Sequence, residues 1–104
     1  MGARPGKLGE DQTVKYFQSL GYTVFNRNDV GFPDLLVTKN GKLEFFVEVK
    51  SGETSYIGMS DQRLYHLKLL KAGFTTKGVR VKDGAVTIEE ERTTDIIPKE
   101  WTQG

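Results

Sequence analysis

Two alternating segments joined by a short polar turn constrain the fold of this chain most. Residues 33–38 and 43–50 each alternate between two sets of side chains, and Lys39-Asn40-Gly41 separates them. Side chains on a strand switch face at every residue, and directly opposed residues share a face. The pattern therefore predicts an antiparallel β-hairpin.

The register of this hairpin decides where its acidic side chains lie. A two-residue Asn40-Gly41 turn would send Glu48 to the face opposite Asp34. A three-residue loop over 39–41, with a left-handed glycine after a type I turn, would pair Asp34 with Phe46. Asp34 and Glu48 would then share one face, and we expect this longer loop.

The same register adds Lys50 to the shared face, which produces a set suited to metal-dependent phosphate chemistry. Carboxylates and phosphate oxygens are the ligands that Mg²⁺ prefers. A bound ion can polarise a phosphodiester and help to generate hydroxide from water. A lysine beside it can hold the attacking water or neutralise charge on the phosphate. A Glu-x-Lys triplet alone also fits a solvated strand face, so the hairpin carries the prediction.

The remaining segments complete a small α+β sandwich, a mixed central sheet covered by helices. Periodicity and glycine stops predict two helices and three further strands, over 7–20, 61–72, 22–27, 75–81 and 85–90. We expect one domain over 1–91 and a loosely held acidic tail over 92–104.

Composition excludes several classes of protein. The sequence contains no run of 18 apolar residues, so no membrane span is predicted. Its polar start also predicts no signal peptide. With no cysteine, the chain has neither disulfides nor a thiolate zinc site, and we expect a cytoplasmic protein. The only histidine, His66, is flanked by leucines, so we expect a core histidine rather than a catalytic one.

Four separated sequence pieces in order resemble the PD-(D/E)XK nuclease superfamily. They are a glutamate in the first helix, Gly-Phe-Pro-Asp, Val-Glu-Val-Lys-Ser-Gly, and Ser-Asp-Gln opening the second helix. Within the superfamily the chain looks most like the small stand-alone VRR-NUC type, typical of phage-encoded and repair nucleases. The resemblance covers about residues 8–82 and implies a restriction-endonuclease-like αβββαβ core that cleaves DNA with Mg²⁺ or Mn²⁺.

The resemblance also implies a set of acidic, basic and amide catalytic residues: Glu10, Asp34, Glu48, Lys50 and Gln62. Asp34 and Glu48 would bind the metal with the backbone carbonyl of Val49, and Glu10 would reach it directly or through water. Lys50 would orient the attacking water, and Gln62 would contact Lys50, the water or a phosphate. Two alternatives stay open, because a first-turn Glu10 also suits the helix dipole and Gln62 also fits a surface amide.

Charge is divided unevenly along the chain, at net +5 over 1–82 and −4 over 83–104. Basic residues of the first part are candidates to meet phosphates, and Tyr56 could stack on an unpaired base or fold onto the core. The DNA-binding candidates are Arg4, Lys7, Arg27, Tyr56 and Arg63, with Lys68 and Lys77 as further phosphate contacts. No residue identifies a base edge, so recognition of DNA shape is expected.

These features together predict a metal-dependent, structure-selective endodeoxyribonuclease acting on branched or junction DNA. Cutting both strands requires two copies of so small a site, so a homodimer is expected. A Holliday junction resolvase is the alternative within this class. A DNA-binding module that keeps the fold and cuts nothing is the alternative from another class.

Overall fold

The computed structural model describes residues 5–26, 33–52, 60–97 and 99–102. Its helices and strands follow the predicted order, with every predicted boundary within two residues of the observed one. The elements are α1 (Pro5–Ser19), β1 (Thr23–Asn26), β2 (Leu35–Lys39), β3 (Lys42–Ser51), α2 (Ser60–Lys71), β4 (Thr76–Lys82), β5 (Ala85–Arg92) and α3 (Lys99–Thr102). The short α3 was not predicted.

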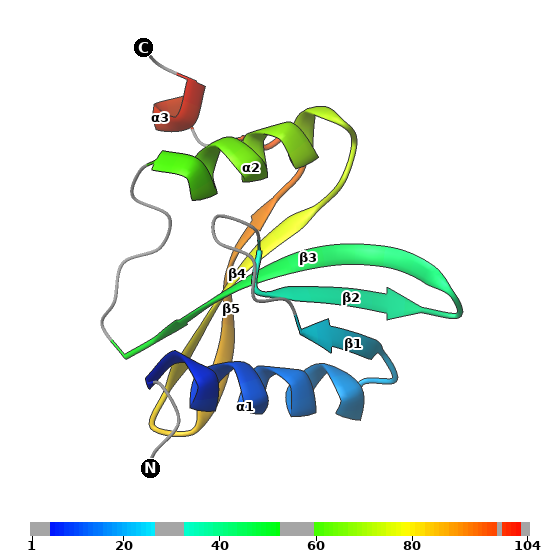
Figure 1. The fold of residues 1–104 in the computed structure, drawn as a ribbon, viewed down its shortest axis with the longest axis vertical. Helices are drawn as coiled ribbons and strands as arrows, with labels where there is room; N and C mark the ends of the chain where they lie inside the picture. The colour runs from blue at the N-terminus through cyan, green and yellow to red at the C-terminus, as the bar shows by residue number, and fades with distance from the viewer. Residues whose placement is uncertain (1–4, 27–32, 53–59, 98, 103–104) are drawn as a thin grey trace.

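The five strands form one mixed sheet in the order β1-β2-β3-β4-β5. β3 and β4 run parallel and are connected through α2, whereas the other neighbouring strands are antiparallel. Figure 1 shows α1 and α2 on opposite sides of this strongly twisted sheet. The predicted α+β class is confirmed, and the arrangement is consistent with a restriction-endonuclease-like core.

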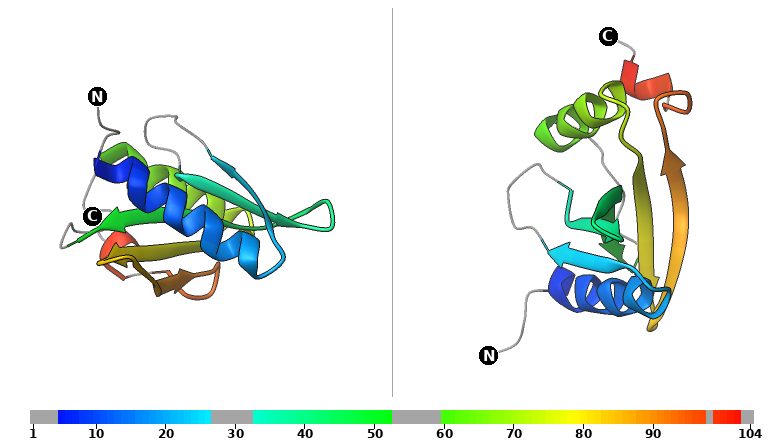
Figure 2. Two further views of the ribbon diagram at one scale, coloured as in Figure 1. Left: turned by 90° about the horizontal axis from the view of Figure 1, so that it is seen from below. Right: turned by 90° about the vertical axis from the view of Figure 1, so that its right-hand side faces the viewer.

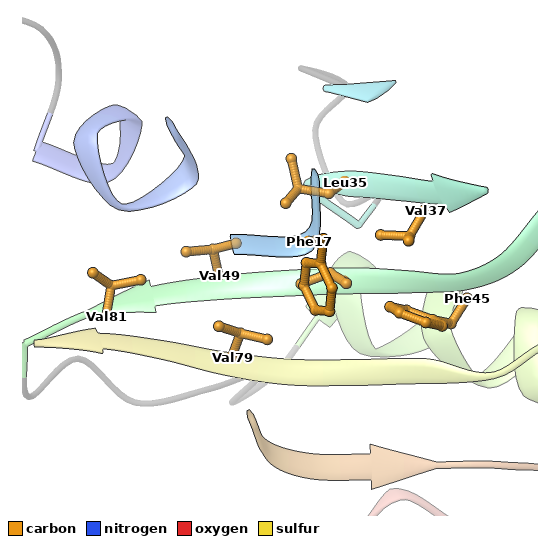
Figure 3. Packing of buried hydrophobic residues seen from close by; sticks show 8 residues of the cluster. Phe17, Leu35, Val37, Phe45, Val49, Val79 and Val81 are labelled. Atoms are coloured by element: carbon orange, nitrogen blue, oxygen red, sulfur yellow. The ribbon is translucent and has the colours of Figure 1, made fainter. Parts of the chain in front are cut away.

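The apolar side chains of odd number over 35–37 on β2, 45–49 on β3 and 79–81 on β4 point toward α1 and form the main apolar core (Figure 3). Phe17 of α1 lies at the centre of this core, and the centroid of its ring is 5.4 Å from that of Phe45. The buried members are Phe17, Leu35, Val37, Phe45, Val47, Val49, Val79 and Val81. Burial of this face fixes which side of β3 the even-numbered residues occupy.

The other side of the sheet is covered by α2 and the C-terminal segment, which lie together in the right-hand view of Figure 2. Leu70 of α2 and Trp101 of α3 are buried against each other, with Leu67 and Ile97 packed around them. The hydroxyl of Thr94 donates a hydrogen bond to the carbonyl of Leu70.

The expectation of a loosely held tail from about Arg92 onward was therefore wrong. Arg92 is only 1% exposed and Trp101 only 9%. The acidic average of this segment concealed a few apolar side chains, which pack on α2 and hold it in place.

Within the part of the chain that the structure describes, no helix is long and apolar enough to cross a membrane.

Candidate active site

The β2–β3 turn is shorter than expected, and the strands reach the required register in another way. Lys39 pairs with Lys42, so the connection is the two-residue turn Asn40-Gly41, with φ angles of 54° and 77°. Two consecutive positive φ values are typical of a type I′ hairpin turn, in which asparagine and glycine are favoured. The prediction of a three-residue loop was wrong.

A β-bulge restores the alignment that the turn alone would lose. Thr38 pairs with Leu43 but Val37 pairs with Phe45, which leaves Glu44 as an extra residue on β3. A bulge of this kind changes the register by one residue. Beyond it Leu35 pairs with Val47, so the next step places Asp34 opposite Glu48 rather than opposite Phe46.

Asp34 is fixed to β3 by its own side chain. The backbone N–H of Val49 donates a 2.8 Å hydrogen bond to Oδ2 of Asp34. Burial raises the pKa of Asp34 above its ordinary value, and the Val49 hydrogen bond and the Lys50 charge partly offset this. The predicted neighbourhood of Asp34, Glu48 and Lys50 is thus present at the end of the hairpin.

Glu48 is fully buried and lies between two cations. Its Oε1 is 3.3 Å from Nη2 of Arg92, and its Oε2 is 3.6 Å from Nζ of Lys50. Burial raises the pKa of Glu48 to about 7, with Arg92 and Lys50 opposing that rise and Asp34 adding to it. Among the described residues, Oε2 receives no hydrogen bond.

This donor set fits a divalent cation, because it offers hard carboxylate oxygens and one buried oxygen without a hydrogen-bond donor. The described residues contain no group of three or more histidine, cysteine, aspartate or glutamate side chains close enough to hold one ion. Glu10 therefore does not join Asp34 and Glu48 in such a group. Its direct ligation of a shared ion, expected from the sequence, is not supported by the geometry.

The structure describes only some of the other predicted site residues. Gln62 lies in the first turn of α2, but its side chain is outside the described residues, as is that of Lys7 in α1. Arg4, Arg27 and Tyr56 also lie outside the described residues. Arg63 is half-buried on α2.

Lys77 is less suited to phosphate binding than its sequence position indicated. Its Nζ is 3.0 Å from Oε2 of Glu91 and 4.2 Å from the centre of the Phe45 ring. An ammonium held in this way is partly neutralised before any phosphate arrives. Lys68 of α2 lies 6.0 Å over the ring of Tyr65.

Arg92, the cation with the largest effect on Glu48, could not be identified from the sequence. The two residues are 44 positions apart, and Arg92 lies at the end of β5, beside Thr76 of β4. No local motif marks this arginine. The strand predicted over 85–90 ended two residues before Arg92, and β5 is separated from β3 by β4, so the sequence offered no signal for this contact.

The side chain of His66, a residue of α2, is buried, as expected. Neither of its ring nitrogens is hydrogen-bonded to any described residue. Its ring centroid is 6.2 Å from that of Trp101 in an edge-to-face arrangement. Burial lowers the pKa of His66 to about 3, with the charges of Arg92 and Lys50 adding to the effect. His66 is therefore a neutral core residue.

Similarity to known proteins extends over nearly the whole chain. A UPF0102 protein of Neisseria meningitidis serogroup C and another of serogroup A are each 33% identical over 112 positions, covering 96% of this chain and 92% of the relative. A UPF0102 protein of Dictyoglomus turgidum is 41% identical over 56 residues, which span 52% of this chain and about half, 48%, of that protein. No family model matches the sequence.

Proposed function

The chain belongs to the UPF0102 family, and we propose that it is a metal-dependent nuclease of the PD-(D/E)XK type that hydrolyses DNA phosphodiester bonds. The observation that carries the proposal is the hydrogen bond from the Val49 N–H to Asp34, which holds one carboxylate beside Glu48 and Lys50. A buried and a half-buried carboxylate beside an ammonium are costly for stability alone, and they suit a phosphate-cleaving site.

Asp34 and Glu48 would hold Mg²⁺ or Mn²⁺, with the carbonyl of Val49 as a further oxygen ligand. The bound ion supplies positive charge that polarises the phosphodiester and makes water more acidic. Asp34 contributes an orientation fixed by the backbone of β3, and Glu48 contributes an oxygen to which no described residue donates a hydrogen bond.

Lys50 would act on water and phosphate rather than on the ion. Its side chain is 22% exposed, and its Nζ lies 3.6 Å from Oε2 of Glu48. A compact ammonium at this position can orient the attacking water and neutralise the charge that grows on the phosphate. Gln62, in the first turn of α2, would contact Lys50, the water or a phosphate.

The preferred substrate is proposed to be branched DNA, which the protein would cleave as a VRR-NUC-like endonuclease. Two copies of the chain would form a homodimer, in which each copy cuts one strand. A Holliday junction resolvase is the narrower form of the same proposal. Phosphate contacts would come from basic residues of the first part of the chain, such as Arg63.

One observation favours a second candidate function, a DNA-binding module without catalysis. Glu48 already has a cation, because Arg92 lies 3.3 Å from it. A carboxylate neutralised in this way has less need of a metal ion. The intact Asp34 and Lys50 argue against this candidate, since a mere binder gains nothing from acids where phosphates must lie.

A panel of labelled junction, flap, splayed and linear duplexes, each with and without Mg²⁺ or Mn²⁺, tests the proposal. We expect cleavage of at least one branched substrate that requires the metal and stops on chelation. Cleavage that survives EDTA would reject the metal-dependent mechanism, and binding without cleavage under every condition would reject the nuclease in favour of the binding module.

A further inference from the structure

Arg92 is a nearly inaccessible charged residue whose guanidinium has three partners. Nε and Nη2 lie 2.9 and 2.8 Å from Oε1 of Glu90, and Nη1 donates a 3.2 Å hydrogen bond to the hydroxyl of Thr76. Nη2 also donates to Oε1 of Glu48 at 3.3 Å. Trp101 closes the far side, with its ring 4.9 Å from the guanidinium carbon.

These contacts determine how Arg92 meets Glu48. A guanidinium that is free to choose usually takes both oxygens of a carboxylate in a parallel pair of hydrogen bonds. Here Glu90 and Thr76 occupy three of the four other N–H groups, and Arg92 donates to only one oxygen of Glu48. The second oxygen, Oε2, receives no hydrogen bond from any described residue.

We propose that Arg92 is a positioning residue of this site: held by Glu90 and Thr76, it grips Oε1 of Glu48 and leaves Oε2 for a divalent cation. This inference rests on the proposed function, since it assumes that Glu48 is a metal ligand. Arg92 itself does not touch DNA, because it is 1% exposed and enclosed by β4, β5 and α3. Outer residues of this kind commonly control metal affinity through the ligands that they orient.

Two substitutions disturb this arrangement in different ways. Arg92→Lys keeps the charge, but one ammonium cannot replace the planar fork that serves three partners. The side chain of Glu90 is 37% exposed, so the Glu90→Gln variant should fold normally. The neutral amide oxygen accepts hydrogen bonds more weakly than a carboxylate, so the guanidinium is held less firmly and can turn onto both oxygens of Glu48 and cover Oε2.

Matched controls come from the neighbouring pair. Nε of Arg80 on β4 lies 2.9 Å from Oε1 of Glu89 on β5, and Nη1 of Arg80 donates to the carbonyl of Gly52. Arg80→Lys and Glu89→Gln therefore repeat the same chemical changes without altering a residue that contacts Glu48.

Calorimetric titration with Mg²⁺ alone gives the first measurement, and emission of Trp101, the only tryptophan, gives the folded fraction. We expect Arg92→Lys and Glu90→Gln to weaken Mg²⁺ binding by about tenfold. Cleavage per folded molecule should show a kcat lowered by about tenfold or more with an unchanged KM for DNA. The two controls should match the wild type in both measurements.

Wild-type Mg²⁺ affinity and wild-type kcat in folded Arg92→Lys or, where that variant does not fold, in Glu90→Gln would overturn the inference. So would a wild-type chain that binds no Mg²⁺. Weakened Mg²⁺ binding in a chain that cuts no DNA would uphold the role of Arg92 and reject the nuclease. Efficient cleavage that neither substitution changes would support the nuclease and reject the role of Arg92.

Discussion

The side chain of Asp34 is joined to the backbone of Val49 by a 2.8 Å hydrogen bond, with the N–H as donor and Oδ2 as acceptor. Val49 lies between Glu48 and Lys50 on β3, and its own side chain is buried toward α1. The position of Asp34 is therefore set by a strand that the core anchors, rather than by side-chain rotamers alone. This coupling makes Asp34, Glu48 and Lys50 a single structural unit.

Asp34→Asn tests whether this unit is catalytic. Asparagine keeps an oxygen that can accept from the Val49 N–H, so the melting temperature should change little. Cleavage should fall by roughly a hundredfold or more, because a neutral amide is a poor ligand for Mg²⁺. DNA binding in the absence of cleavage should stay equal or tighten, since negative charge near the phosphate is removed.

Asp34→Leu is the matched control for the hydrogen bond. It leaves the Val49 N–H without its acceptor and should lower the free energy of unfolding by about 1–2 kcal/mol. If Asp34→Asn cleaves as fast as the wild type, Asp34 is a structural acceptor and not a metal ligand.

Lys50→Ala separates the chemical step from metal binding. We expect most of the turnover to be lost while Mg²⁺ affinity measured by calorimetry changes little, because Lys50 acts on water and phosphate. Lys50→Arg should rescue poorly, since a planar fork does not replace a compact ammonium. Loss of metal binding as complete as in Asp34→Asn would overturn this role.

The elements themselves could be predicted because their signals are local. Alternation of period two marks residues 33–38 and 43–50, and the left-handed Gly41 lies at the predicted turn, although that turn has two residues instead of three. The common face of Asp34 and Glu48 was predicted for the wrong reason. A bulge at Glu44 supplies the one-residue shift that a longer loop was expected to supply.

The rest of the site depends on packing that leaves no local trace. Nothing in the residues around Glu44 marks a bulge, because its place is set by which neighbours the core must bury. The pairing of Arg92 with Glu48 joins strands that only the completed sheet brings together. Whether Glu10 faces the site depends on how α1 docks, which helical periodicity alone does not fix.

Trp101→Ala measures how firmly the C-terminal segment holds α2. Trp101 is 9% exposed, packs on Leu70 and stacks on Arg92, so truncation leaves a cavity and an uncovered guanidinium. The free energy of unfolding should fall by about 3 kcal/mol in urea denaturation. Ile96→Ala, at a side chain that is 61% exposed, is the control and should cost under about 1 kcal/mol. Equal, small effects of both substitutions would restore the view of a loosely held tail.

His66 predicts how the stability of the protein responds to acid. Burial lowers its pKa from 6.5 to about 3 in the folded chain, with Arg92 of β5 and Lys50 of β3 as the charges that add to the effect. Between these two values the unfolded chain binds the proton and the folded chain does not. The free energy of unfolding should therefore fall as pH is lowered through this range, by at most about 1.4 kcal/mol per pH unit.

His66→Phe isolates this contribution, because it removes the titrating group and keeps an aromatic ring beside Trp101. Glu48 acts in the opposite direction: its pKa is raised from 4.5 to about 7, so its stabilising effect is lost as pH rises through that interval. Both chains carry Glu48, so the difference in unfolding free energy between them reports His66 alone. That difference should change with pH from about 6.5 down to 3 and stay flat above 7, measured by urea denaturation at each pH. A difference that is independent of pH would mean that His66 has the same pKa in the folded and unfolded chains.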